Sequence, residues 1–66
     1  MDKELSTHAS SDPFLTTEEL ADYLKVSPST VYDWRTNRTG PKAYRIGKHT
    51  RYRASDVEAW LEKQVA

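Results

Sequence analysis

The side chains best suited to chemistry in this sequence are cations concentrated in one stretch. Between Trp34 and Arg53 there are seven Arg and Lys residues and no Asp or Glu, although the 66-residue chain has a formal net charge of zero. Seven acidic and two basic residues give residues 1–33 a net charge of −5, and residues 34–66 carry +5. Charges of both signs usually alternate on a protein surface, so this basic stretch favours contact with a polyanion over an ordinary solvated face.

The sequence lacks the residue patterns of an enzyme or a metal site. It has no Cys, and its two His residues are isolated, so the ligand spacing of a metal centre is missing. No grouping of His, Ser and Asp suggests nucleophilic catalysis, and no Gly-rich loop suggests a phosphate cradle. We therefore predict a protein that is not an enzyme and uses no cofactor, metal or small-molecule ligand.

The length allows one small domain, which buries only about 60% of its unfolded surface. Residues 1–13 are polar, rich in Ser and Thr, and end in Asp-Pro, which predicts a disordered N-terminal tail before a folded domain over residues 14–66. No apolar run approaches the roughly 18 residues of a membrane span, and the N-terminus does not resemble a secretory signal. We expect a cytoplasmic protein with no membrane contact.

Capping patterns predict two short helices close together in the chain. Thr16 and Glu19 have the spacing of a capping box and predict a helix over residues 17–25. Ser27 is a suitable N-cap for a second helix over residues 28–37, which has Pro at its first position. Only Val26 and Ser27 separate the two helices, so they must turn sharply, as in a helix-turn-helix motif.

The second predicted helix has a polar face opposite its apolar side. Val31 and Trp34 form the apolar side and should pack on the first helix. The polar face combines positions i, i+3, i+4 and i+7 with Arg35 on its flank, and its members are Ser29, Tyr32, Asp33, Arg35 and Thr36. Such a face suits base reading in the major groove of DNA, whereas an ordinary amphipathic helix is the alternative.

The basic stretch itself has the pattern of a β-hairpin. The segments KAYRIG and HTRYR predict two strands around Gly47-Lys48, with Tyr44 and Ile46 facing Tyr52. In this register three arginines point outward: Arg45, Arg51 and Arg53. A basic hairpin beside a helix-turn-helix is a wing, and its tip, formed by Lys48, His49 and Thr50, would reach phosphates or a minor groove.

A third helix should close the domain. Ser55 and Glu58 repeat the capping-box spacing, which predicts a helix over residues 56–64 with Asp56 in its first turn. Trp60 lies on its apolar face and should pack against Trp34 and the tyrosines of the wing. A stacking platform for single-stranded nucleic acid is the less favoured interpretation of these aromatic residues. The expected fold is mainly α with a small β-hairpin, a winged helix-turn-helix.

The order LTTEELADYLKVSPSTVYDWR…YRIGKHTRYRASDVEAWL resembles the excisionase family of small winged helix-turn-helix proteins, related to the DNA-binding domains of mercury-resistance-type regulators. The resemblance covers residues 14–62 and implies double-stranded DNA binding without enzymatic activity. It assigns base reading to the polar face of the second helix. Wing contacts are assigned to Lys48, His49, Thr50 and Arg51, and phosphate contacts to Thr30, Arg38, Arg45 and Arg53.

The resemblance also implies what such a protein does on DNA. Family members bind repeated sites side by side and bend the DNA, so head-to-tail self-association and an integrase partner are expected. Because no long helix follows residue 66, we expect no ligand-sensing domain, and we favour a phage or plasmid excisionase over a small transcriptional regulator. A protein-interaction module that uses the acidic residues of the first helix (Glu18, Glu19 and Asp22) is an alternative of another class.

Overall fold

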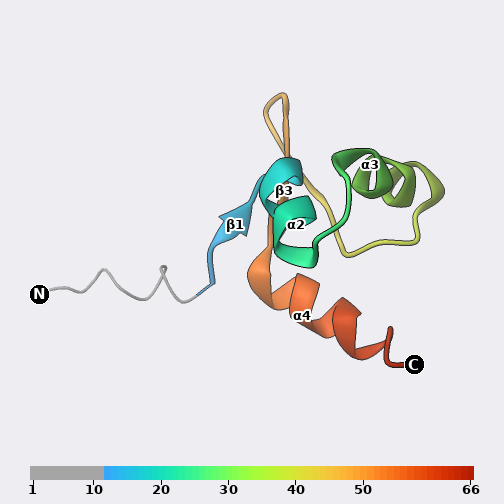
Figure 1. Ribbon diagram of the computed structural model, residues 1–66. Helices are drawn as coiled ribbons and strands as arrows, with labels where there is room; N and C mark the ends of the chain where they lie inside the picture. Colours follow the sequence, from blue (N-terminus) through green and yellow to red (C-terminus); the bar gives the residue numbers. More distant parts are fainter. Residues whose placement is uncertain (1–11) are drawn as a thin grey trace, which may run out of the picture.

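The computed structural model describes residues 12–66, which form three helices and a small antiparallel sheet (Figure 1). The elements in chain order are β1 (Phe14–Leu15), α2 (Thr17–Leu24), α3 (Pro28–Asn37), β2 (Tyr44–Ile46), β3 (His49–Arg53) and α4 (Ala54–Glu62). The sheet has the strand order β1-β3-β2. No helix within these described residues is long and apolar enough to cross a membrane.

The first two helices begin where their capping residues predict. The Thr16 hydroxyl accepts from the Glu19 amide at 2.9 Å, and the Glu19 carboxylate accepts from the Thr16 amide at 2.8 Å, completing the capping box of α2. Helix α2 ends at Leu24 because Lys25 adopts the left-handed conformation, with φ 60°. Helix α3 begins at Pro28 after the Ser27 cap, so the helix-turn-helix is confirmed.

The core lies where α2, α3 and α4 meet one face of the sheet. Its buried members are Leu20, Ala21, Val31, Tyr52 and Val57, with Leu15, Leu24, Val26, Trp34 and Leu61 packed against them. Leu15, directly before the N-cap of α2, and Leu20 have the spacing of a hydrophobic staple, and both belong to this core. Ala21, the smallest of the buried side chains, is 1% exposed.

The register of the hairpin differs from the prediction by one residue. Tyr44 pairs with Arg51 and Ile46 with His49, so these four side chains share one face of the sheet. Tyr52 lies on the other face, where it is buried in the core at 2% exposure. The expected contact of Tyr44 and Ile46 with Tyr52 was wrong. Ile46 remains 50% exposed, because the helices cover only the Tyr52 face.

Strand β1 was not predicted, and it ties the start of the described chain to the sheet. Phe14 pairs with Arg53 and Leu15 with Tyr52. The predicted tail, residues 1–13, lies outside the described residues except for its last two. Of these, the Pro13 carbonyl accepts from the Ala54 amide at 2.9 Å, and Asp12 accepts from the Ser55 amide at 2.8 Å and from the Ser55 hydroxyl at 3.0 Å.

Helix α4 begins at Ala54, two residues before the predicted start. Its N-cap is Arg53, which makes no side-chain cap, so the predicted Ser55–Glu58 capping box was wrong. Asp12 binds the Ser55 amide from a distant part of the chain and replaces a local cap. Asp56 does occupy the first turn, as expected, and it accepts from the Tyr44 hydroxyl at 2.8 Å.

The two tryptophans join α3 to α4. The ring centroids of Trp34 and Trp60 are 5.0 Å apart at an interplanar angle of 50°, which confirms their predicted contact. Trp60 Nε1 donates to the Thr39 carbonyl at 2.9 Å, so its polar edge is satisfied. Gly40 follows closely, and a Cβ atom built there would lie 2.7 Å from Trp34 Cβ. Glycine therefore allows the loop after α3 to pass tightly over Trp34.

Candidate DNA interface

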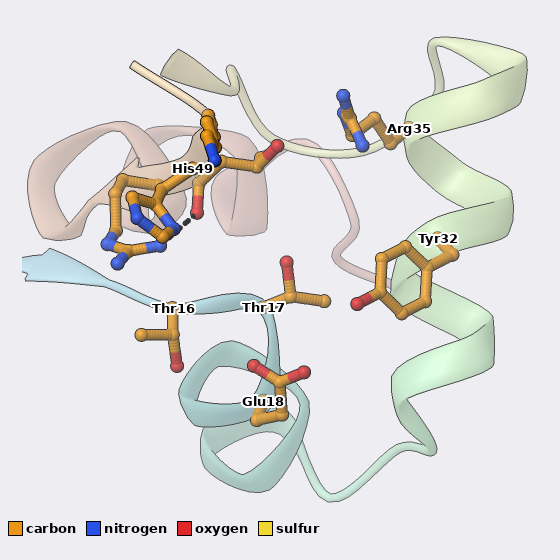
Figure 2. Close-up of a pocket in the computed structure, with 9 residues that line it drawn as sticks. Thr16, Thr17, Glu18, Tyr32, Arg35 and His49 are labelled. Carbon is orange, nitrogen blue, oxygen red and sulfur yellow. Dashed lines mark hydrogen bonds between the residues drawn. The ribbon is translucent and has the colours of Figure 1, made fainter. Parts of the chain in front are cut away.

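An open groove of about 430 Å³ lies between the start of α2, one side of α3 and the wing (Figure 2). Its lining consists of Thr16, Thr17 and Glu18 from the start of α2, Tyr32 and Arg35 from α3, and Lys48, His49, Thr50 and Arg51 from the wing. The sheet brings these elements together, because the pairing of Leu15 with Tyr52 places the start of α2 beside β3. Six of these nine residues were predicted DNA ligands.

Helix α3 presents Tyr32 and Arg35 to this groove. Both side chains extend from the helix toward the start of α2 and the wing in Figure 2. Tyr32 is 46% exposed, and Arg35 is exposed as well. A phenol and a guanidinium side by side offer hydrogen-bond donors, a flat ring and a positive charge, which suit base edges and phosphates alike.

The wing contributes a second set of polar groups. Arg51 Nη1 donates to the Thr50 carbonyl at 2.8 Å, which holds the guanidinium along the strand. Arg45 Nε donates to the Gly47 carbonyl at 3.3 Å across the turn. Gly47 has a φ of 63°, so the tight turn needs a residue that tolerates the left-handed conformation. The tip is therefore short, exposed and rich in donors.

Tyr52 lies beneath this groove. Burial raises the pKa of its hydroxyl, while the charge of Arg35 and the hydroxyl of Thr17 oppose part of that rise. Thr17 is itself buried, at 5% exposure. The floor of the groove is thus a packed contact between the sheet and the two helices, which fixes the spacing between α3 and the wing.

Several predicted ligands on α3 lie outside the groove lining. Two of them have hydroxyls within hydrogen-bond distance of the hydroxyl of the N-cap residue Ser27. The distance is 3.0 Å for Ser29 and 3.1 Å for Thr30. Asp33 and Thr36 are exposed on the helix. None of these four residues belongs to the lining of the groove.

Arg38 lines a second hollow of about 250 Å³ on another side of α3. Arg35 and Lys42 line it as well, together with Trp34, Gly40, Pro41 and Ala43. No acidic side chain contributes to this lining. Arg35 borders both hollows, so cations extend from the wing across α3 to the loop that follows it.

Arg53 is placed apart from the groove. Its guanidinium lies over the rings of Phe14 and Tyr44, at 5.7 and 5.1 Å from their centroids. Arg53 Nε is also 3.8 Å from Asp56 and 3.9 Å from Asp12. Two carboxylates thus lie within ion-pair distance of this guanidinium. Arg53 therefore packs on the face of the sheet that carries Phe14 and Tyr44. Within residues 12–66, the other predicted phosphate ligands form no ion pair with an acidic side chain.

Among the polar and charged aliphatic side chains that line the groove and the second hollow, four were not predicted as DNA ligands: Thr16, Thr17, Glu18 and Lys42. Lys42 is one of the seven cations of the basic stretch, so its charge was a signal that could have identified it. The start of α2 carried a capping signal but no indication that it adjoins the wing. That proximity depends on β1, a two-residue strand with no local pattern.

Two helices joined by a tight turn, a basic hairpin and a third helix define a winged helix-turn-helix domain. The model of a helix-turn-helix domain family matches residues 14–65, and the chain belongs to this family. The protein is therefore a DNA-binding helix-turn-helix protein. A search of curated proteins finds no match to the chain.

Proposed function

We propose that the protein binds double-stranded DNA in a sequence-specific manner, with α3 in the major groove and the wing on the flanking backbone. The observation that carries this proposal is the groove in which Tyr32 and Arg35 of α3 face Lys48, His49 and Arg51 of the wing. A recognition helix reads base edges, and an adjacent cationic wing fixes its register on the duplex.

The proposed contacts follow from where each side chain lies. Base reading is assigned to Ser29, Tyr32, Asp33, Arg35 and Thr36, and wing contacts to Lys48, His49, Thr50 and Arg51. Phosphate contacts are assigned to Thr30, Arg38 and Arg45, to which the second hollow adds Lys42. Arg53 is also expected to bind phosphate. To do so, it must exchange its ion pairs with Asp12 and Asp56 for a contact with DNA.

The biological role we propose is that of an excisionase, a factor that directs an integrase toward excision of a phage or plasmid. The resemblance of residues 14–62 to that family supports this role. Copies would bind repeated sites head to tail and bend the DNA. An excision assay with a phage or plasmid integrase and its attachment sites, run beside a promoter-repression assay, separates this role from that of a small transcriptional regulator.

Salt dependence tests DNA binding at the basic surface. If four to six cations contact phosphates, the affinity should fall roughly 10²–10³-fold between 50 and 200 mM salt, because each contact contributes a slope of about −0.9. Fluorescence anisotropy on a labelled duplex measures this slope. A flat response to salt would contradict the proposed interface.

Two substitutions separate the reading helix from the wing. Arg35→Ala should lose about 1–3 kcal/mol of discrimination between the cognate site and a mutated one, because a guanidinium reads a base edge. Lys48→Ala should weaken both sites about equally, because a phosphate contact carries no sequence information. Gel-shift titrations on both duplexes give the ratio, and the reverse pattern would mean that the wing reads the sequence.

A further inference from the structure

A second surface, apart from the DNA groove, combines an apolar hollow with acidic residues. The hollow has a volume of about 240 Å³, lies between α2 and α4, and is lined by Leu15, Tyr23, Ala54, Val57 and Glu58. Tyr23 and Glu18 are five positions apart, which places them about 140° apart around α2. The hollow and the DNA groove therefore open on different flanks of this helix.

The hollow is apolar inside and polar at its edge. Leu15, Ala54 and Val57 supply aliphatic walls. Tyr23 is 54% exposed, and its hydroxyl donates to Glu58 Oε2 at 2.7 Å, which joins α2 to α4. This hydrogen bond and the charge of Glu58 raise the pKa of Tyr23. A tyrosine with an apolar ring and a polar tip is typical of the rim of a protein interface.

Acidic residues extend from the hollow along both helices. Glu19 lies one turn before Tyr23 on α2, and Glu62 lies one turn after Glu58 on α4, and all three glutamates are exposed. Each of two carboxylates accepts one hydrogen bond within the protein: Glu19 Oε1 accepts from the Thr16 amide, and Glu58 Oε2 accepts from the Tyr23 hydroxyl. No Lys or Arg belongs to the lining of the hollow. The surface thus presents negative charge around an apolar centre.

We propose that this hollow docks a basic segment of another protein, which inserts one apolar side chain between α2 and α4. Lys or Arg residues on either side of that anchor would pair with Glu19, Glu58 and Glu62. An apolar cavity of about 150 Å³ holds benzene, so the hollow has room for one phenyl ring. DNA does not fit this surface, because carboxylates repel phosphates.

Charge complementarity also decides between a different protein and a second copy. The cations of this chain are concentrated between Arg35 and Arg53, the stretch that the proposed function commits to DNA. A basic segment on a different protein leaves that stretch free, so the protein could hold DNA and its partner together. The inference rests on the proposed function only for this choice of occupant.

The first experiment uses a synthetic helical peptide of Lys and Ala with one central Phe as the probe. Amide NMR spectra of the ¹⁵N-labelled full chain, recorded with and without duplex DNA, should shift at Tyr23, Ala54 and Val57 in both states. Matched peptides with Glu in place of Lys, or Ala in place of Phe, should shift these amides at least tenfold less at equal concentration. Equal shifts with the acidic peptide, or shifts confined to the DNA groove, would overturn the inference.

Charge reversal at the hollow provides the matched test. Glu58→Arg should weaken peptide binding about tenfold or more, and Glu58→Gln, which keeps an acceptor for Tyr23, should weaken it several-fold. Glu18→Arg makes the same charge change on the groove side of α2 and should leave peptide binding unchanged. Circular dichroism confirms that each variant is folded, and equal peptide affinity in folded Glu58→Arg would refute the proposal.

DNA binding by the same samples separates this inference from the proposed function. Glu58→Arg should not weaken the affinity for duplex DNA, because Glu58 lies outside the groove. If the wild-type protein binds the peptide at the hollow but not DNA, the proposed function fails and the docking surface stands. If the free protein dimerises with shifts at Tyr23 and Val57, the occupant is a second copy and the choice of a different protein is wrong.

Discussion

Glu18 is the one acidic side chain among the nine residues that line the DNA groove. Its position in the first turn of α2 explains its presence, because a carboxylate there interacts favourably with the helix dipole. The capping box does not need it, since Glu19 supplies that carboxylate. The same charge faces approaching phosphates, so at this position helix stability and DNA affinity have opposite requirements.

Neutralising Glu18 should therefore change the two properties in opposite directions. Glu18→Gln should tighten DNA binding several-fold on any sequence, because a repulsion on the order of 1 kcal/mol is removed. It should also lower the free energy of unfolding by about 0.3–1 kcal/mol through the lost dipole interaction. Anisotropy and urea titrations measure the two effects, and Asp22→Asn, outside the groove, should leave affinity much closer to wild type. If Glu18→Gln instead weakens binding, and only to duplexes that carry a C·G pair at one position, Glu18 reads the cytosine of that pair.

The raised pKa of the Tyr52 hydroxyl makes the stability of the domain depend on pH. Burial raises its pKa in the folded state, so the unfolded chain loses this proton first as the pH rises. The free energy of unfolding should therefore be constant up to about pH 10, the ordinary tyrosine pKa, and fall above it. Tyr52→Phe should flatten that fall in urea titrations at pH 10–11, although Tyr23, whose pKa is also raised, leaves part of it. An unchanged slope in a folded Tyr52→Phe variant would contradict this assignment.

At the scale of elements, α2 and α3 end in the same unusual way. Lys25 has a φ of 60° and Arg38 a φ of 59°, the left-handed conformation that glycine adopts at least cost. Each residue ends its helix, and its amide donates to carbonyls of the last turn. A side chain in this conformation costs roughly 1–2 kcal/mol. The turn of the helix-turn-helix therefore carries strain at Lys25.

Relieving this strain should stabilise the protein. Lys25→Gly should raise the free energy of unfolding by about 0.5–1 kcal/mol, the part of the conformational cost that remains after the greater freedom of glycine in the unfolded chain. A thermal melt should show a midpoint increase of a few degrees, as expected for a domain of this size. Lys25→Ala serves as the control, because it removes the same side chain and keeps the strain. A Lys25→Gly variant no more stable than Lys25→Ala would contradict the prediction.

The elements that the sequence predicts well are those with local signals. Thr16 with Glu19, and Ser27 with Pro28, mark the starts of α2 and α3 because each cap lies within three residues of the amide it binds. The start of α4 has no such local cap. Its Ser55 amide binds Asp12, 43 positions away, so no local pattern marks it.

The hairpin and the groove show the same limit. Alternation along 44–53 predicts two strands, but register depends on which face the helices cover, and Tyr52 alone is buried there. Spacing on α3 likewise predicts its outward residues, including Tyr32 and Arg35. The start of α2 joins them only through the pairing of Leu15 with Tyr52, a contact between residues far apart in the chain.

At the scale of the molecule, positive and negative side chains of the described residues gather around different hollows, with Glu18 in the DNA groove as an exception. Cations line the groove and the second hollow around α3. Glu58 lines the hollow between α2 and α4, and Glu19 and Glu62 are exposed one helical turn away from its lining residues. The proposed DNA site and the proposed docking site for a basic segment are therefore separate. One module of this size buries roughly 600–1,000 Å² on DNA, which seldom provides the specificity that a genome demands. We therefore expect sequence-specific action to need several copies on one DNA.

These copies should assemble on DNA rather than in solution. The helices of the described residues contain eight, ten and nine residues, too short for a stable coiled-coil dimer, so the free protein should sediment as a monomer. On a duplex with two adjacent repeats, the wing or α4 of one copy can meet the helices of the next, which gives an open head-to-tail arrangement along the DNA. Two repeats should then bind at least tenfold more tightly than two independent sites, and moving the repeats half a helical turn apart should abolish the gain. Analytical ultracentrifugation and titrations on one, two and respaced repeats measure these properties, and a stable free dimer or independent binding to paired repeats would refute the arrangement.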